Sequence, residues 1–331
     1  MAWRPYAGAL VSVAALAWLV GALRQSGADA RLVLSLVAWG IMLGGIVGLG
    51  AIGLSLVYGV LRFGNFAHGD LMTVGAYAAL AILPMLPQGP PLRPLSFGWE
   101  MIPALLLAMA LTGLVSVAID RILYRPLRRR RSSPVLVAMA SLGAAFFLRS
   151  ALYLGWGADF RFYYTGRARP SIALPLGIRL RPDQIFVMAL AVVLVVLTYL
   201  LLTRTRLGKA MRATADNPVL ARVSGIDTER IARWTWLIGG ALAGAGGVML
   251  GLDAQLRPEM GWALLLPMFA AAILGGIGNP YGALVGGLVM GVVQQVSTVV
   301  VNPAYAPGVA LVVMIALLLL RPRGLLGGAA G

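Results

Sequence analysis

The 331-residue sequence lacks cysteine altogether and contains a single histidine. It therefore forms no disulfide, and the usual protein ligands of a zinc site are almost absent. Charged residues make up only 11% of the chain, against roughly a quarter in soluble proteins. Together with 60% hydrophobic residues and a mean hydropathy of +0.88, this scarcity excludes an ordinary soluble domain and indicates an integral membrane protein.

Acidic residues are scarcer still, with 11 Asp and Glu against 27 Lys and Arg, which gives a net charge of +16. Such a balance is also typical of nucleic-acid-binding proteins, but those need a contiguous basic face. Here the arginines gather in a few loops between apolar runs, which is the pattern that membrane orientation produces. We therefore expect membrane lipid as a partner and no nucleic acid.

The apolar runs predict an all-α fold, a polytopic transmembrane helical bundle. A span needs about 20 apolar residues to cross ~30 Å of hydrocarbon, and the chain offers about nine or ten such stretches. The run 32–61 is long and rich in glycine, which indicates a tilted or broken helix, and Asn279-Pro280 indicates a turn. The expected spans lie near 6–23, 32–61, 71–87, 101–119, 134–154, 185–202, 234–252, 262–277, 281–301 and 306–320.

The basic loops predict the orientation of the bundle. The segments 120–133 and 203–233 and the tail with Arg321 and Arg323 should lie in the cytoplasm, which places both termini inside. The segment 155–184 must then be external, although it carries five arginines against two aspartates. We expect these arginines to bind lipid headgroups or the acidic surface of a partner.

Residues 1–30 have a basic start, an apolar stretch and the small-x-small ending Ala28-Asp29-Ala30. They are either an additional N-terminal transmembrane helix or a cleaved, signal-like segment. The retained helix is favoured, because a protein with many spans does not need a cleavable leader.

The expected spans contain almost no ionisable residue. None occurs from Leu32 to Leu61, from Trp234 to Leu252, or between Glu259 and Arg321. Carriers driven by ion gradients usually keep such groups inside the bundle. The exception, Arg149, is near the outer end of its span and is expected to extend to the interface. The driving force for any transport should therefore come from outside the bilayer.

Glycine is abundant, with 42 residues, and often recurs every fourth position, as at Gly40, Gly44 and Gly48. This spacing predicts close helix packing. The denser run "GGIGNPYGALVGG" also indicates broken helices beside a pathway.

A polar island interrupts the apolar pattern at 203–233, "TRTRLGKAMRATADNPVLARVSGIDTERIAR". Asn217 suits an N-cap, Pro218 the first helical position and Gly225 the residue after the end. These signals predict a helix of about seven residues that presents Val219, Leu220 and Val223 on one side. The helix either docks on a partner or lies on the membrane surface.

Three stretches resemble the signature regions of one family. "YGVLRFGNFAHGDLMTVGAYAAL", "GKAMRATADNPVLARVSGIDTERIA" and "AAILGGIGNPYGALVGGLVMGV" are similar to segments of the H-type, LivH-like permease subunits of bacterial branched-chain amino acid ABC importers. The resemblance covers about residues 32–325, in the family's order. It implies a permease transmembrane domain over 31–325 and a cytoplasmic tail at 326–331.

The resemblance also implies partners. They are a homologous M-type permease subunit, two cytoplasmic ATPase subunits and an external or periplasmic solute-binding protein, in the bacterial cytoplasmic (inner) membrane. The chain itself should be no enzyme and hold no cofactor, with ATP and Mg bound by the partners. In agreement, Gly208-Lys209 is followed by Ala210 and lacks the spacing of a P-loop.

By the same resemblance the island is the coupling loop, and its short helix contacts an ATPase subunit. Arg222 is a candidate for an ion pair with that subunit. The residues assigned to coupling are Asp216, Asn217, Pro218, Val219, Leu220, Arg222, Val223 and Gly225.

The pathway or inner gate is assigned to a second set. Asp70 is expected to cap a helix starting at Leu71, and His68 to make a structural hydrogen bond rather than contact substrate. Asn65 either lies near the pathway or holds the gate loop. The set comprises Asn65, His68, Asp70, Gly275, Gly276 and Gly278.

The solute stays open among leucine, isoleucine, valine, other amino acids, amides and urea. An autonomous secondary carrier or channel for a small neutral solute is the alternative function. A membrane-embedded enzyme is disfavoured, because the spans show no acid pair, cysteine or histidine cluster.

Overall fold

A computed structural model describes residues 29–164, 170–174, 177–320 and 324–326. The expected span 6–23 lies outside the described residues. The described part is almost entirely helical, as predicted, with one two-stranded antiparallel pair, β1 (Ile172–Ala173) and β2 (Arg179–Leu180). The helices are α2 (Ala30–Leu61), α3 (His68–Ile82), η1 (Leu83–Met85), α4 (Met101–Ile119), η2 (Asp120–Tyr124), α5 (Arg125–Arg129), α6 (Pro134–Trp156), α7 (Pro182–Arg204), α8 (Arg206–Asp216), α9 (Pro218–Val223), α10 (Thr228–Asp253), α11 (Met260–Gly275), α12 (Pro280–Ser297), η4 (Pro303–Tyr305) and α13 (Ala306–Leu320).

Every expected span from residue 32 onward coincides with one of these helices. Among the described residues, five helical stretches are long and apolar enough to cross a membrane: α2, Met101–Arg129, α6, α7 and α10. The helices α11 and Pro303–Leu319 are apolar but shorter. The fold is a helical polytopic membrane bundle.

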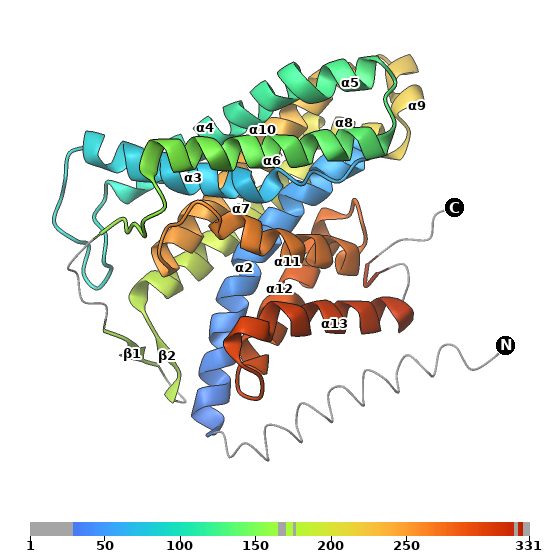
Figure 1. Cartoon of the computed structure of the whole chain (residues 1–331). Coiled ribbons are helices and arrows are strands. Elements are labelled where there is room, and N and C mark those ends of the chain that lie inside the picture. Colours follow the sequence, from blue (N-terminus) through green and yellow to red (C-terminus); the bar gives the residue numbers. More distant parts are fainter. Residues whose placement is uncertain (1–28, 165–169, 175–176, 321–323, 327–331) are drawn as a thin grey trace, which may run out of the picture.

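The bundle is organised around α2 and α10. In Figure 1, α2 crosses the molecule obliquely, with α3, α4 and α6 on one side of it and α11, α12 and α13 on the other. The helix α12 packs along α2, and α10 packs against α4, α3 and α2. These contacts bury the central part of α2 from Gly44 to Val57.

Glycine makes the α2–α12 contact possible. A Cβ atom on Gly44 would lie 2.7 Å from the Cα of Leu288, and one on Gly287 would lie 2.5 Å from the Cα of Gly48. The packing role predicted for the glycines spaced four apart is confirmed here. The prediction of a possible break in 32–61 is wrong, since α2 is one continuous helix.

The segment 120–133 is not the simple loop that its charge suggested. A π-turn, η2, continues α4 into α5. Buried Asp120 accepts hydrogen bonds from the Arg128 guanidinium, and Arg125 forms a 2.9 Å ion pair with Glu229 on α10. Neutralising these arginines within the chain lets the helix run beyond the apolar stretch.

Two arginines of the 155–184 segment likewise have partners within the chain. Arg181 pairs with Asp253, and the backbone of Arg161 bridges to Leu256 while its guanidinium donates to the Trp156 carbonyl. Arg181 is therefore paired within the fold, contrary to the expectation that it serves lipid or a partner. The Arg161 guanidinium stays exposed and pairs with no acid among the described residues, so for Arg161 that expectation stays a prediction.

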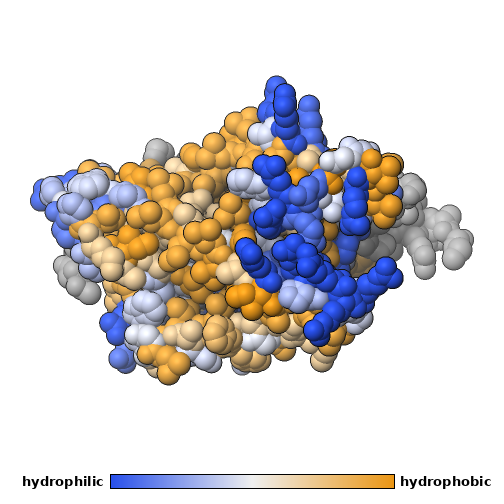
Figure 2. Space-filling view, turned by 90° about the horizontal axis from the view of Figure 1, so that it is seen from above, coloured by the Kyte–Doolittle hydropathy of each residue, from blue (hydrophilic) through white to orange (hydrophobic). Residues whose placement is uncertain are grey.

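The segments 120–133 and 203–233 lie together at one end of the bundle, called the basic end below, and the β1–β2 hairpin lies at the other (Figure 1). Figure 2 shows hydrophilic side chains gathered toward the basic end and an apolar surface across the middle of the molecule. This division between an apolar belt and a basic end is what the predicted cytoplasmic orientation requires.

Candidate functional site

The polar island folds into two helices, of which the sequence predicted one. Thr205 caps α8 by accepting a hydrogen bond from the Gly208 amide at 3.0 Å. One side of α8 packs on the bundle through buried Met211 and Thr214. The strongly amphipathic pattern of 206–216 was the signal that could have revealed this helix.

The second helix, α9, has the predicted ends. The Asn217 side chain accepts hydrogen bonds from the amides of Val219 and Leu220, both at 3.0 Å, and Pro218 occupies the first turn. At the other end Gly225 has φ +85°, which favours glycine, and its amide donates to the Arg222 carbonyl. The caps are confirmed, and the helix has six residues rather than about seven.

The apolar side chains of α9 face away from the protein. Val219, Leu220 and Val223 are 70%, 62% and 82% exposed, whereas Ala221 is buried against the bundle. Each large side chain left in water forgoes about 1.5–3 kcal/mol of possible burial free energy. A rigid, capped helix that presents three such side chains is suited to docking.

The two charged members of the predicted coupling set are also at the surface. Asp216 ends α8 and is exposed. The Arg222 guanidinium donates to the Thr228 hydroxyl at 3.4 Å, and no acid pairs with it among the described residues. An ion pair between Arg222 and an ATPase stays a prediction.

The segment between α2 and α3 is buried and tied to its surroundings. Asn65 is fully buried, and its side-chain oxygen accepts from the Ala67 amide at 3.1 Å and from the Tyr124 hydroxyl at 3.2 Å. The Phe66 amide donates to the Ser141 hydroxyl at 2.9 Å. Asn65 therefore holds this segment against η2, while Ser141 holds it to α6.

Asp70 does not cap a helix, because α3 already begins at His68. Its carboxylate, fully buried, receives two hydrogen bonds from the Arg149 guanidinium, at 2.9 and 3.0 Å. The guanidinium also lies 4.4 Å from the ring centroid of Trp262. A buried carboxylate must be paired, so Arg149 turns inward, and the expectation that it extends to the interface is wrong.

His68 is fully buried beside Gly53, where an added Cβ would lie 3.0 Å from Nε2. Its ring interacts with the backbone of Gly50, but neither ring nitrogen reaches hydrogen-bonding geometry in the described part of the chain. The ring is a packing element between α2 and α3, and the expected structural hydrogen bond, for which the Gly50 backbone is the nearest candidate, stays a prediction.

The three predicted gate glycines lie in the α11–α12 turn. A Cβ on Gly275 would lie 2.0 Å from the carbonyl carbon of Gly282, and Gly276 and Gly278 have φ values of +108° and +84°. Asn279 then caps α12 by accepting from the Tyr281 and Gly282 amides. The turn is tight because only glycine allows these approaches.

The C-terminal residues close over this turn, which the sequence did not predict. The amides of Leu325 and Leu326 donate to the carbonyls of Leu274 and Gly275 at 2.7 and 3.1 Å, and the Asn279 side chain donates to the Leu326 carbonyl. These bonds satisfy carbonyls at the end of α11 that have no partner within the helix.

The predicted site residues thus form two separate groups, the coupling set on α8 and α9 and the gate set inside the bundle. Within the described residues, no three His, Asp or Glu side chains cluster as metal ligands would. The arrangement offers a docking helix and a tightly packed helical interior, and no constellation of catalytic groups is apparent in it.

Relatives of known type share most of this chain. It is 30% identical over 297 residues to the high-affinity branched-chain amino acid transport system permease protein BraD of Pseudomonas aeruginosa, which covers 87% of this chain and 94% of the relative. The corresponding LivH protein of Escherichia coli K12 is 29% identical over 298 residues, covering 87% and 93%. The probable LivH permease of Methanocaldococcus jannaschii is 30% identical over 288 residues, covering 84% and 87%.

No solved structure matches the chain. Residues 36–318 match the model of the family described as branched-chain amino acid transport system, permease component. This match includes both the gate set and the coupling set. The chain therefore belongs to the branched-chain amino acid permease family and is a LivH-like permease.

Proposed function

We propose that this chain is the permease subunit of an ATP-binding-cassette importer, located in the cytoplasmic (inner) membrane. Together with a second, homologous M-type permease it forms the pathway for branched-chain amino acids or a related small solute. Two separate ATPase subunits drive the transport, and a solute-binding protein delivers the solute. The relatives transport branched-chain amino acids, which supports this class of solute for the chain.

The observation that carries this proposal is the exposed apolar side of α9. Its three large side chains are between 62% and 82% exposed. Defined caps at both ends hold the helix that carries them in place. The helix rests on α8 and α10, so a force on α9 reaches two helices of the bundle. A cleft on an ATPase subunit would bury the apolar side and transmit nucleotide-driven movement through these contacts.

The autonomous carrier has one observation in its favour, the buried pair of Asp70 and Arg149. A carboxylate inside the bundle is the kind of group that ion-coupled carriers use. Here both of its oxygens are engaged by one guanidinium, so a transported proton or sodium ion would have to compete with Arg149 for the carboxylate. The pair therefore supports a structural role, and the importer is the better proposal.

The test is uptake by the reconstituted complex. We expect leucine to accumulate in vesicles only when the ATPase subunits, ATP and the binding protein are all supplied, and a protonophore to leave the initial rate unchanged. Accumulation by this chain alone under an ion gradient would overturn the proposal in favour of the carrier.

A further inference from the structure

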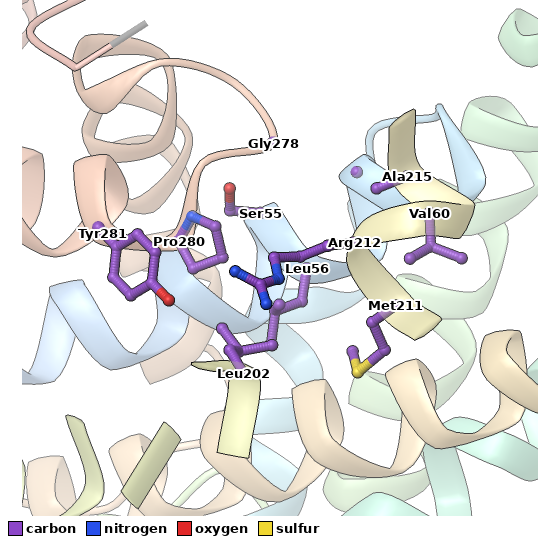
Figure 3. Close-up of a pocket in the computed structure, with 11 residues that line it drawn as sticks. Ser55, Leu56, Val60, Leu202, Met211, Arg212, Ala215, Gly278, Pro280 and Tyr281 are labelled. Atoms are coloured by element: carbon purple, nitrogen blue, oxygen red, sulfur yellow. The ribbon is translucent and has the colours of Figure 1, made fainter. Parts of the chain in front are cut away.

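A pocket lies where the basic end meets the apolar belt, between α2, the end of α7, α8 and the start of α12. Its empty volume is about 380 Å³, counting the space open to solvent. Most of its wall is apolar, including Leu56, Leu202, Met211 and Pro280 (Figure 3). None of the predicted coupling residues lines it, and of the gate set only Gly278 does.

Three polar side chains line this otherwise apolar pocket, and none of them has a hydrogen-bond or ion-pair partner among the described residues. Arg212 lines it and forms no ion pair among the described residues. Figure 3 shows its guanidinium lying beside Leu56, with the Tyr281 hydroxyl pointing toward it. Ser55 also lines the pocket, is only 1% exposed, and its hydroxyl has no hydrogen-bond partner in the described structure.

The unsatisfied Ser55 hydroxyl is unusual for a buried group. Serine in a helix normally donates to a carbonyl one turn earlier, and a buried polar atom left alone costs about 1–3 kcal/mol. The hydroxyl, the phenol and the guanidinium can all donate hydrogen bonds. Three donors, one of them cationic, call for an anionic ligand with several acceptor oxygens.

The position of the pocket identifies the source of that anion. The exposed rings of Tyr199 and Tyr281 meet edge to face at its rim, 5.6 Å apart. Exposed Arg204 and Arg206 follow Tyr199 in sequence. Aromatic side chains followed by basic ones mark the cytoplasmic membrane–water interface, and basic pockets between helices at that level bind anionic lipid headgroups.

We propose that this pocket binds the phosphate of an anionic phospholipid from the cytoplasmic leaflet. Arg212 pairs with the phosphate, Ser55 and Tyr281 donate to its oxygens, and Leu202 and Leu56 contact the glycerol and first acyl carbons. A bound lipid would join α8, which leads into α9, to α2 and α12. Lipid binding at this site does not require ATP-driven transport, so it can be tested independently of the proposed function.

The test uses the purified protein with whatever subunits accompany it, in detergent. Phosphatidylglycerol, phosphatidylcholine or inorganic phosphate is added, and bound lipid is counted by native mass spectrometry alongside the thermal unfolding midpoint. The key variant is Arg212→Gln. The matched control is Lys209→Gln, an exposed cation one turn earlier on α8 that does not line the pocket.

We expect phosphatidylglycerol, but neither phosphatidylcholine nor inorganic phosphate, to bind and raise the unfolding midpoint. Arg212→Gln should weaken this binding about tenfold, and Lys209→Gln should leave it unchanged. Ser55→Ala removes only the hydroxyl and should weaken it about threefold, which keeps the test informative if Arg212→Gln fails to fold. Equal binding by Arg212→Gln and Lys209→Gln, or equal stabilisation by inorganic phosphate, would overturn the proposal.

Discussion

The α9 helix and the segment around Asp70 both depart from the usual placement of side chains, and they do so in opposite directions. On α9 apolar side chains face water, although Val219, Leu220 and Val223 could each be buried favourably. Around Asp70 polar side chains are buried among helices, although each would be better solvated outside. No described residue covers the apolar side chains of α9, whereas the buried carboxylate of Asp70 is paired with Arg149.

This difference separates a surface that we propose docks another subunit from a contact that holds the fold. The buried carboxylate of Asp70 on α3 is paired with Arg149 on α6, so this contact fixes how the two helices pack. An exposed apolar helix with firm caps remains unsatisfied until a second protein covers it. Substitutions on α9 should consequently affect assembly and transport, whereas substitutions of Asp70 or Arg149 should affect folding.

The largest effect is expected when the apolar side of α9 is charged. The double change Val219→Asp with Leu220→Asp should lower ATP-dependent uptake and ATPase association by at least about tenfold, because charges would have to enter an apolar cleft. Uptake and co-purification of the ATPase measure this. The matched control, Val219→Ile with Leu220→Met, keeps the surface apolar and should retain both activities; an unaffected double Asp variant would show that α9 is not the contact.

A large effect on stability is expected from Arg149→Gln. Removing one partner of a buried pair costs about 3–5 kcal/mol, and thermal unfolding in detergent should show it. Combining Asp70→Asn with Arg149→Gln should recover part of the loss, because no unpaired charge remains. The control is Arg121→Gln at an exposed position, which should leave the unfolding midpoint unchanged. If the double variant is as unstable as the sum of the single ones, the pair does not act as a unit.

A smaller effect is expected from Asn217→Ala. Loss of an N-cap costs about 1 kcal/mol, so α9 frays and its affinity for the ATPase should fall roughly fivefold. Asn217→Ser can still cap the helix and should restore most of the affinity. The binding isotherm of the ATPase subunit gives both numbers, and an unchanged affinity in Asn217→Ala would mean that the cap is irrelevant to docking.

The features predicted from sequence are those determined by neighbours along the chain. The caps of α9 depend on Asn217, Pro218 and Gly225, which lie within nine positions of one another, and the structure has each in its predicted place. The apolar helices after residue 32 were likewise predicted, because long apolar runs have few other solutions in a membrane.

The features that were missed join distant parts of the chain. The Asp70–Arg149 pair spans 79 positions, and Arg149 could be judged only by its place near a helix end. The pocket of Ser55, Arg212 and Tyr281 draws on three helices, and none of these residues belongs to a local motif. The hydrogen bonds of the C-terminal residues to the end of α11 equally depend on packing that local patterns do not encode.

Whether α9 is the point at which an ATPase acts can be tested directly, because the chain contains no cysteine. A single Val223→Cys variant carries its only thiol on α9, where Val223 is 82% exposed, and Val312→Cys places one on α13, where Val312 is 65% exposed. In the assembled, transporting complex we predict that a short thiol-reactive cross-linker joins Val223→Cys, and not Val312→Cys, to an ATPase subunit. A fully active complex in which Val223→Cys forms no such product would contradict the account.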